Sequence, residues 1–263
     1  MGTVLMRAEA LLFLTALQFL TRLPVPAAPW SPDGLGRASR YFPAIGALVG
    51  ALTAAVWLAA VAVLPAPAAA GLALAAGIAL TGALHEDGLA DTADALGGHA
   101  GRDRALEILR DSRIGTYGTL ALVLSLGLRW SALSALAPGP GAIALVLAAT
   151  LGRAVMVPVS RLMPPARSDG LGAGVATGPD RLGFMIAGIT VLVVPALVLY
   201  WIGPATLPTL AATALVAVLA ASLPLRAAQR RLGGYTGDIL GAACQMAEIA
   251  VLLTLAALLA EAA

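Results

Sequence analysis

Three aspartates share one face of a helix that we expect to follow the second apolar stretch of the chain. Asp87, Asp91 and Asp94 stand at positions i, i+4 and i+7, so a helix would stack their carboxylates and make them repel one another. Carboxylate oxygens suit a hard divalent ion, and magnesium takes a few of them while keeping positions for water and a phosphate. We therefore predict a magnesium site whose ligands are Glu86, Asp87, Asp91 and Asp94.

Two residues beside these acids are further candidates for the same site. Gly88 has no side chain, which would let a phosphate or the backbone of another segment approach closely between the first two ligands. His85 could join the metal site or act as a catalytic base, or it could only form hydrogen bonds at the membrane interface. The alternative for the whole segment is a solvated helix face, which is the usual meaning of a run of charges.

Arginines follow the acidic helix closely enough to share its site. A guanidinium group binds phosphate oxygens through two parallel hydrogen bonds, so Arg110 and Arg113 would suit a pyrophosphate. Arg102, Arg104 and Glu107 are more simply interpreted as salt bridges on the surface of a helix. Carboxylates and arginines at one membrane face favour phosphoryl transfer, in which the protein positions the reactants and neutralises phosphate charge through a metal.

Four more polar residues interrupt apolar stretches further along the chain. Asp238 lies in a glycine-rich turn before the last stretch and could join the substrate site beside Asp87, or it could only cap a helix. Arg153 and Glu248 lie within predicted spans, where ionisable groups are costly and are usually functional. Arg129 lies nearer the opposite interface, and we expect its side chain to reach toward the lipid headgroups.

The composition shows where the helices that position these residues must lie. Of the 263 residues 60% are hydrophobic and 11% charged, and the mean hydropathy is +0.91, which excludes a soluble globular protein and predicts a membrane protein. A net charge of +2 gives no reason to expect a nucleic-acid partner. The single cysteine, Cys244, excludes an internal disulfide. No repeat or linker divides the chain, so residues 1–263 are predicted to form one domain.

Seven stretches are apolar and long enough to cross a bilayer, which takes about 20 residues of helix. We therefore predict an all-α, polytopic integral membrane protein with about seven transmembrane helices. A shorter apolar stretch, 10–20, is expected to lie at the interface or to re-enter the membrane. The seven predicted spans are 42–64, 68–84, 117–137, 141–161, 184–202, 205–223 and 241–260.

The connections between the predicted spans are alternately short and long. Three are tight turns that contain proline, whereas the long ones hold most of the arginines and most of the acidic residues. With seven spans the long connections share one membrane face, and the arginines place that face in the cytoplasm. One of them, 162–183, is rich in glycine and proline and is expected to be either a mobile loop over the site or a passive connector. The long connections are 22–41, 85–116, 162–183 and 224–240.

Several motifs, in order along nearly the whole chain, resemble the cobalamin synthase family. The resemblance implies a magnesium-dependent enzyme of a prokaryotic inner membrane, which completes the nucleotide loop of cobalamin. Its substrates would be adenosylcobinamide-GDP and α-ribazole or α-ribazole 5′-phosphate, and GMP would be released. An oligomer is possible. The motifs are residues 19–26, 41–47, 85–98, 111–118 and 237–242.

The residues and the implied reaction together suggest a mechanism. The 3′-hydroxyl of the ribazole would attack the phosphorus attached to the cobinamide arm, and Asp94 or Asp111 would accept its proton. Two other classes of protein stay open. A CDP-alcohol phosphotransferase uses a similar acidic helix, but the arginine expected shortly after its Asp-Gly pair is absent here. A transporter would place its charges near the bilayer midplane, whereas these acids lie at one end of a span.

Overall fold

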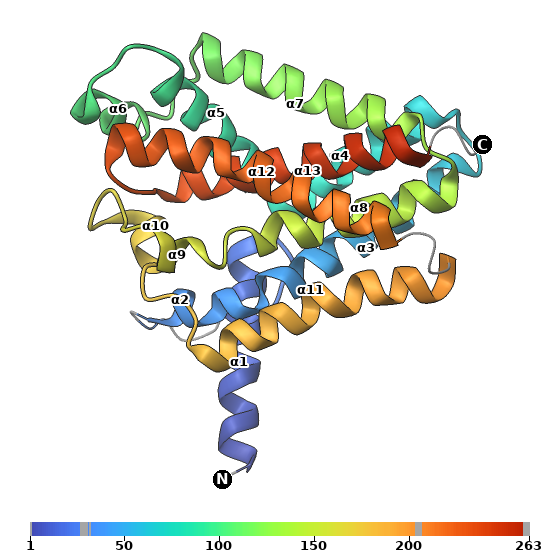
Figure 1. Ribbon diagram of the computed structural model, residues 1–263, viewed down its shortest axis with the longest axis horizontal. Helices are drawn as coiled ribbons and strands as arrows, with labels where there is room; N and C mark the ends of the chain where they lie inside the picture. The colour runs from blue at the N-terminus through green and yellow to red at the C-terminus, as the bar shows by residue number, and fades with distance from the viewer. Residues whose placement is uncertain (1, 27–30, 32, 203–206, 260–263) are drawn as a thin grey trace.

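The computed structural model describes residues 2–26, 31, 33–202 and 207–259 of the chain. Apart from one isolated bridge, the regular structure in this part of the chain is helical (Figure 1). The prediction of an all-α protein is therefore confirmed. The elements are α1 (Gly2–Leu20), α2 (Gly34–Ala38), the 3₁₀ helix η1 (Ser39–Tyr41), α3 (Phe42–Val61), α4 (Ala66–Thr81), α5 (Leu84–Gly97), α6 (Arg102–Ile108), α7 (Thr116–Ser134), α8 (Pro138–Ala154), α9 (Val159–Leu162), α10 (Gly170–Gly174), α11 (Arg181–Ile202), α12 (Leu207–Leu232) and α13 (Gly237–Leu259).

Most of the long helices run between the same two ends of the molecule, as a multi-pass membrane protein requires (Figure 1). In the described part of the chain five helices are long and apolar enough to cross a membrane, and the bent pair α4 and α5 makes a sixth if it is one span. The predicted number of seven is therefore not confirmed. The five are Gly34–Val61, Pro138–Leu162, Arg181–Val198, Leu207–Leu232 and Gly237–Leu259.

The bend between α4 and α5 sets the direction of the acidic helix. Gly82 and Ala83 both adopt left-handed backbone angles, with φ of 64° and 58°, which is a common way to end a helix. The two helices consequently meet at 89°. Glycine takes such an angle without strain, whereas Ala83 takes it at a cost of about 1 kcal/mol. The break therefore turns the residues after Thr81 out of the line of α4.

The closest helix pair, α3 and α8, is brought together by glycines. A Cβ atom on Gly46 would lie 2.3 Å from the carbonyl oxygen of Ala149, and one on Gly50 would lie 2.6 Å from the Cα atom of Val146. Glycines four residues apart let two membrane helices approach until their backbones touch. This contact fixes α8, which carries Arg153, against the α3 side of the bundle.

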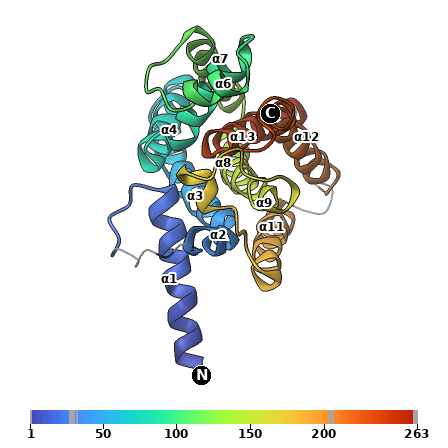
Figure 2. The same ribbon diagram turned by 90° about the vertical axis from the view of Figure 1, so that its left-hand side faces the viewer.

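The N-terminal helix is longer than the predicted stretch 10–20, because it begins at Gly2. It runs across the direction of the spanning helices, which Figure 2 shows nearly end-on. Glu9 ties it to the bundle, since its carboxylate accepts hydrogen bonds from Arg40 at 3.0 Å and from the Tyr41 hydroxyl at 2.7 Å. This orientation is compatible with both predicted positions, at the interface or re-entering the membrane.

Two of the long connections are more ordered than the sequence suggests. Helix α12 continues through Pro224 to Leu232, so the predicted loop 224–240 shrinks to the residues between α12 and α13. That turn holds segment 162–183 by backbone hydrogen bonds, from Ala166 to the carbonyl of Tyr235 and from Tyr235 to the carbonyl of Pro164. The predicted tight turn at 203 and 204 lies outside the described residues.

Cysteine labelling would test the arrangement of the two ends. Gly101, before α6, and Gly139, in the first turn of α8, lie at opposite ends of the molecule (Figure 1). A Cβ atom at either position would have nothing within 4 Å, so a cysteine fits there. In a variant with Cys244→Ala, we expect an impermeant thiol reagent to label Gly101→Cys and Gly139→Cys from opposite sides of the membrane. Labelling of both from one side would contradict the described topology.

Candidate active site

Helix α5 presents two carboxylates that have no partner. Asp87 is exposed and Asp91 half-buried, and within the described residues neither forms a hydrogen bond or an ion pair. They lie one helical turn apart, as the sequence predicts. Asp91 also interacts electrostatically with several other carboxylates, of which Asp87 and Asp238 act most strongly. We call Asp87, Asp91 and Asp238 the acidic face.

Asp238 reaches this position because Gly88 has no side chain. A Cβ atom on Gly88 would lie 2.8 Å from the carbonyl oxygen of Asp238 and 3.1 Å from its Cα atom, so the start of α13 packs directly on α5. Of the two groups that Gly88 was expected to admit, a phosphate or the backbone of another segment, the structure shows the second, since the backbone of Asp238 fills the space beside it. A cavity of about 90 Å³ adjoins this contact, and its lining includes His85, Asp87 and Asp238.

His85 is buried and faces an arginine. Its Nδ1 atom lies 3.2 Å from Nη2 of Arg153. A guanidinium can only donate, so Nδ1 must accept and the ring proton is on Nε2. Nε2 is buried and has no hydrogen-bond partner among the described residues. The structure therefore contradicts the role of His85 as a base, because the nitrogen that could take a proton is already bound to a cation.

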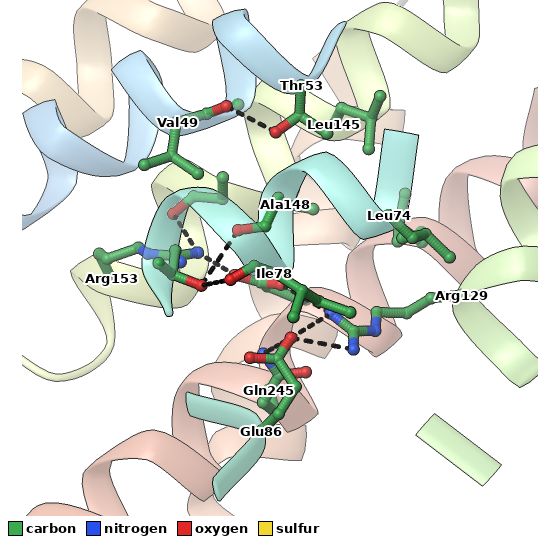
Figure 3. A pocket seen from close by; sticks show the side chains of 16 residues that line it. Val49, Thr53, Leu74, Ile78, Glu86, Arg129, Leu145, Ala148, Arg153 and Gln245 are labelled. Atoms are coloured by element: carbon green, nitrogen blue, oxygen red, sulfur yellow. Dashed lines mark hydrogen bonds and ion pairs between the residues drawn. The ribbon is translucent and has the colours of Figure 1, made fainter. Parts of the chain in front are cut away.

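Glu86, the predicted fourth metal ligand, points away from the acidic face into the interior of the protein. Its Oε1 atom accepts hydrogen bonds from Nη1 and Nη2 of Arg129, both at 3.1 Å, and from Nε2 of Gln245 at 3.2 Å (Figure 3). Residues 86 and 87 lie about 100° apart around a helix axis, so they cannot share a face. The structure therefore removes Glu86 from the ligand set.

A second carboxylate completes this buried network. Glu248 of α13 is hydrogen-bonded to Arg153 of α8 and lies 3.6 Å from Nη1 of Arg129. Arg129 is 4% exposed, so the expectation that it reaches toward the lipid headgroups is wrong. Two acids and two arginines balance one another here, which is how charges persist in an apolar interior. A cavity of about 50 Å³ beside them, lined in part by Glu86 and both arginines, is large enough for water.

Asp94 holds the start of α7 rather than a metal. Its carboxylate accepts hydrogen bonds from the backbone N–H groups of Gly115 at 2.7 Å and Gly118 at 2.9 Å. An acid at a helix N-terminus also interacts favourably with the helix dipole. Cβ atoms on these two glycines would lie 2.5 and 2.4 Å from the carboxylate oxygens. Because its oxygens are engaged in this way, we no longer assign Asp94 as a ligand or as a base.

The predicted phosphate-binding arginines are paired with acids on the surface. Arg113 donates to Asp111, and hydrogen bonds from its side chain and then its backbone lower the pKa of Asp111 to about 2. A carboxyl with so low a pKa is a weak proton acceptor at neutral pH, which argues against Asp111 as the base. Arg110 donates to both carboxylate oxygens of Asp169, at 3.1 and 2.9 Å. Neither arginine contacts the acidic face.

No preformed metal site exists in the described residues, because no three or more His, Cys, Asp or Glu side chains gather closely enough to hold an ion. The donor chemistry nevertheless suits magnesium. Asp87 and Asp91 are unpaired oxygen donors, and Asp238 approaches from another helix. A cation bound there would offset the repulsion among these three carboxylates.

The comparisons with known proteins agree with the motifs. The family described as cobalamin-5-phosphate synthase matches residues 12–256. The chain belongs to this family. Similar proteins are the adenosylcobinamide-GDP ribazoletransferases of Sinorhizobium medicae, 46% identical over 92% of this chain and 94% of that protein, and of Leptothrix cholodnii, 45% identical over 93% and 94%. That of Shewanella amazonensis is 42% identical over 95% of this chain and 96% of its own length. No solved structure matches.

In this member of the cobalamin-5-phosphate synthase family, sequence reasoning missed three residues near the site. Gln245 donates to Glu86, and Asp169 accepts two hydrogen bonds from Nη2 of Arg110. Arg167 lies 3.9 Å from Asp238. Only Gln245 could have been recognised from the sequence, since it is a polar residue inside an apolar span and stands one helical turn before Glu248. Asp169 and Arg167 lie in a loop, where charged residues are common.

Proposed function

We propose that the protein joins adenosylcobinamide-GDP to α-ribazole or its 5′-phosphate, and so produces adenosylcobalamin or its 5′-phosphate and GMP. Family membership supports this reaction, as do relatives that match over more than nine-tenths of the chain and are named adenosylcobinamide-GDP ribazoletransferase. The observation that carries the proposal is the acidic face. Of its three carboxylates, two have no partner among the described residues. The face lies at the end of the molecule that also holds α6 and α10 (Figure 1).

The reaction is a displacement at phosphorus. The ribazole hydroxyl oxygen forms a bond to the phosphorus attached to the cobinamide arm, the bond from that phosphorus to GMP breaks, and the hydroxyl proton leaves. Asp94 and Asp111 are engaged by other groups, and we assign the carboxylates of the acidic face to a cation, so the hydroxyl proton passes to water. The negative charges of this face repel the pyrophosphate, so the pyrophosphate binds here only when a cation lies between it and the carboxylates.

Magnesium is the cation that we propose, with Asp87, Asp91 and Asp238 as its ligands in place of the set predicted from the sequence. A bound magnesium ion would neutralise charge on the pyrophosphate and on the departing GMP. The contact at Gly88 sets the distance between α5 and α13, and therefore holds Asp238 beside Asp87 and Asp91. Asp111 and Asp169 also bind Arg113 and Arg110, which keeps these arginines away from the acidic face.

We place the acidic face in the cytoplasm of a prokaryotic cell, with the protein in the inner membrane. The support is the distribution of arginine, which is concentrated in the segments around α6, α10 and the end of α12. Adenosylcobinamide-GDP is large, and the short turn between α3 and α4 leaves little polar surface at the other end. Both substrates would therefore reach the site from the same aqueous phase.

The proposed activity can be tested in membranes that contain the protein. We expect GMP to be released when adenosylcobinamide-GDP and α-ribazole 5′-phosphate are both present, and release should require magnesium. Omission of the ribazole is the control, because transfer needs both substrates. If GMP appears at the same rate without the ribazole, the protein is a hydrolase and the proposal fails.

A further inference from the structure

Arg167 is an enclosed arginine whose hydrogen-bond donors are unused. Its side chain is 17% exposed, and Nη1 is fully buried without a hydrogen-bond partner in the described part of the chain. Nε lies 3.7 Å from Asp169 and Nη2 lies 3.9 Å from Asp238. Both distances are too long for hydrogen bonds. The guanidinium is therefore held by charge between two acids, with its five N–H donors free.

The other enclosed arginines differ in this respect. Arg40 donates to Arg37, Glu9 and Asp180. Arg231, which is half-buried, donates to two backbone carbonyls. The buried Arg129 and Arg153 donate to Glu86 and Glu248 respectively. Those arginines have a structural role that accounts for their burial. Buried polar groups are nearly always hydrogen-bonded, so the unused donors of Arg167 indicate a partner that is bound only at times.

The backbone around Arg167 leaves room for its guanidinium. Gly170 adopts a left-handed conformation with φ of 81°, and a Cβ atom there would lie 3.2 Å from Nη2 and 3.4 Å from Nε of Arg167. A glycine thus lets the loop turn closely around the charged group. The same loop is fastened at Ala166 to the carbonyl of Tyr235, which keeps Arg167 beside Asp238.

We propose that Arg167 binds the pyrophosphate of the nucleotide-activated substrate, next to the acidic face. This inference rests on the proposed function, since it concerns the same site. A planar guanidinium offers parallel donors to two phosphate oxygens. A cation held by Asp87, Asp91 and Asp238 would add a second positive charge near Arg167, which lies 3.9 Å from Asp238. Arg110 and Arg113, which the sequence favours for this role, are paired with Asp169 and Asp111.

The test compares two corrinoids that differ only in the pyrophosphate and nucleoside. Protein in lipid nanodiscs is titrated with adenosylcobinamide-GDP and with adenosylcobinamide, in magnesium and without ribazole, and binding is followed by corrinoid absorbance. Arg167→Gln should weaken binding of the GDP derivative at least about tenfold, which is ~1.4 kcal/mol, and leave binding of adenosylcobinamide unchanged. Arg167→Lys should lie between, because it keeps the charge and loses the fork. Arg104→Gln, on an exposed surface, is the matched control and should bind both as the wild type does.

A second measurement uses the wild-type protein, so it does not depend on how a variant folds. Phenylglyoxal modifies arginines, and peptide mass spectrometry reports each position. Adenosylcobinamide-GDP or inorganic pyrophosphate should slow modification of Arg167 severalfold, whereas adenosylcobinamide should not, and Arg104 should react equally in all cases. Equal rates at Arg167, or a glutamine variant that binds the GDP derivative as tightly as the wild type, would overturn the inference. Failure of the proposed function would instead appear as wild-type protein that releases no GMP with both substrates present.

Discussion

Asp87→Asn and Asp91→Asn are each expected to abolish turnover and to leave expression and membrane insertion intact. An amide is a weaker magnesium ligand than a carboxylate and does not balance its charge. The interactions that a metal makes with a phosphoryl group contribute several kcal/mol, and a loss of ~2.7 kcal/mol already lowers the rate about a hundredfold. Both side chains lack partners within the described residues, so their replacement removes no structural contact. GMP release in reconstituted membranes, measured across magnesium concentrations, gives the result.

Asp103→Asn is the matched control for these two variants. Asp103 lies on α6 with a side chain that is 92% exposed, and its ion pair with Arg102 is 3.5 Å long. Its loss should change turnover less than about twofold, because exposed ion pairs contribute only about 0–1 kcal/mol. Near-normal rates of Asp87→Asn or Asp91→Asn at saturating magnesium would remove that residue from the site.

Arg129→Leu is expected to be the most damaging single change to the fold. It would leave Glu86 without its cationic partner in the protein interior and would take from Glu248 one of its two cations. Removal of one partner from a buried ion pair costs roughly 3–5 kcal/mol, because the remaining charge is uncompensated. We expect a lower yield of folded protein and a lower midpoint of thermal aggregation in detergent.

The double variant Arg129→Leu with Glu86→Gln separates charge from packing. Replacement of both partners leaves no unpaired charge at this point, so the double variant should recover part of the lost thermal stability. Arg104→Leu removes an arginine from an exposed pair with Glu107 and should leave the midpoint unchanged. If the double variant is less stable than Arg129→Leu alone, the network does not act by charge compensation.

The sequence predicts correctly the part of the acidic face that the geometry of a single helix determines. The i, i+4 spacing of Asp87 and Asp91 is enough to place both on one side of α5. The same geometry separates Glu86 from Asp87, so the sequence alone already argues against Glu86 as a ligand beside them. Asp94 was also on the expected side, but its function depends on where the chain returns after α6, which no local pattern encodes.

Contacts between distant segments account for the other errors. Arg129 was placed at an interface because its partners, Glu86 and Glu248, are far away in the sequence and only the packing of α5, α7 and α13 brings them together. Seven spans are not confirmed, because α7, which takes the place of the predicted span 117–137, is not among the helices that are long and apolar enough to cross a membrane, and α4 passes this test only together with α5. Arg167 has no distinguishing pattern at all, since its role follows from the turn that fastens its loop.

The buried pair of Glu86 and Arg129 also restricts how this protein can evolve. Substitution of Arg129 alone leaves the buried carboxylate of Glu86 without its cation, so loss of the pair is tolerated best when both positions change together. Asp87 follows Glu86 directly, and the rotation of α5 that exposes Asp87 is the rotation that buries Glu86. Insertion of one residue between Ala83 and Glu86 would turn the following residues by about 100°, so that Glu86 would take the exposed position of Asp87 and the ion pair would be lost together with the acidic face.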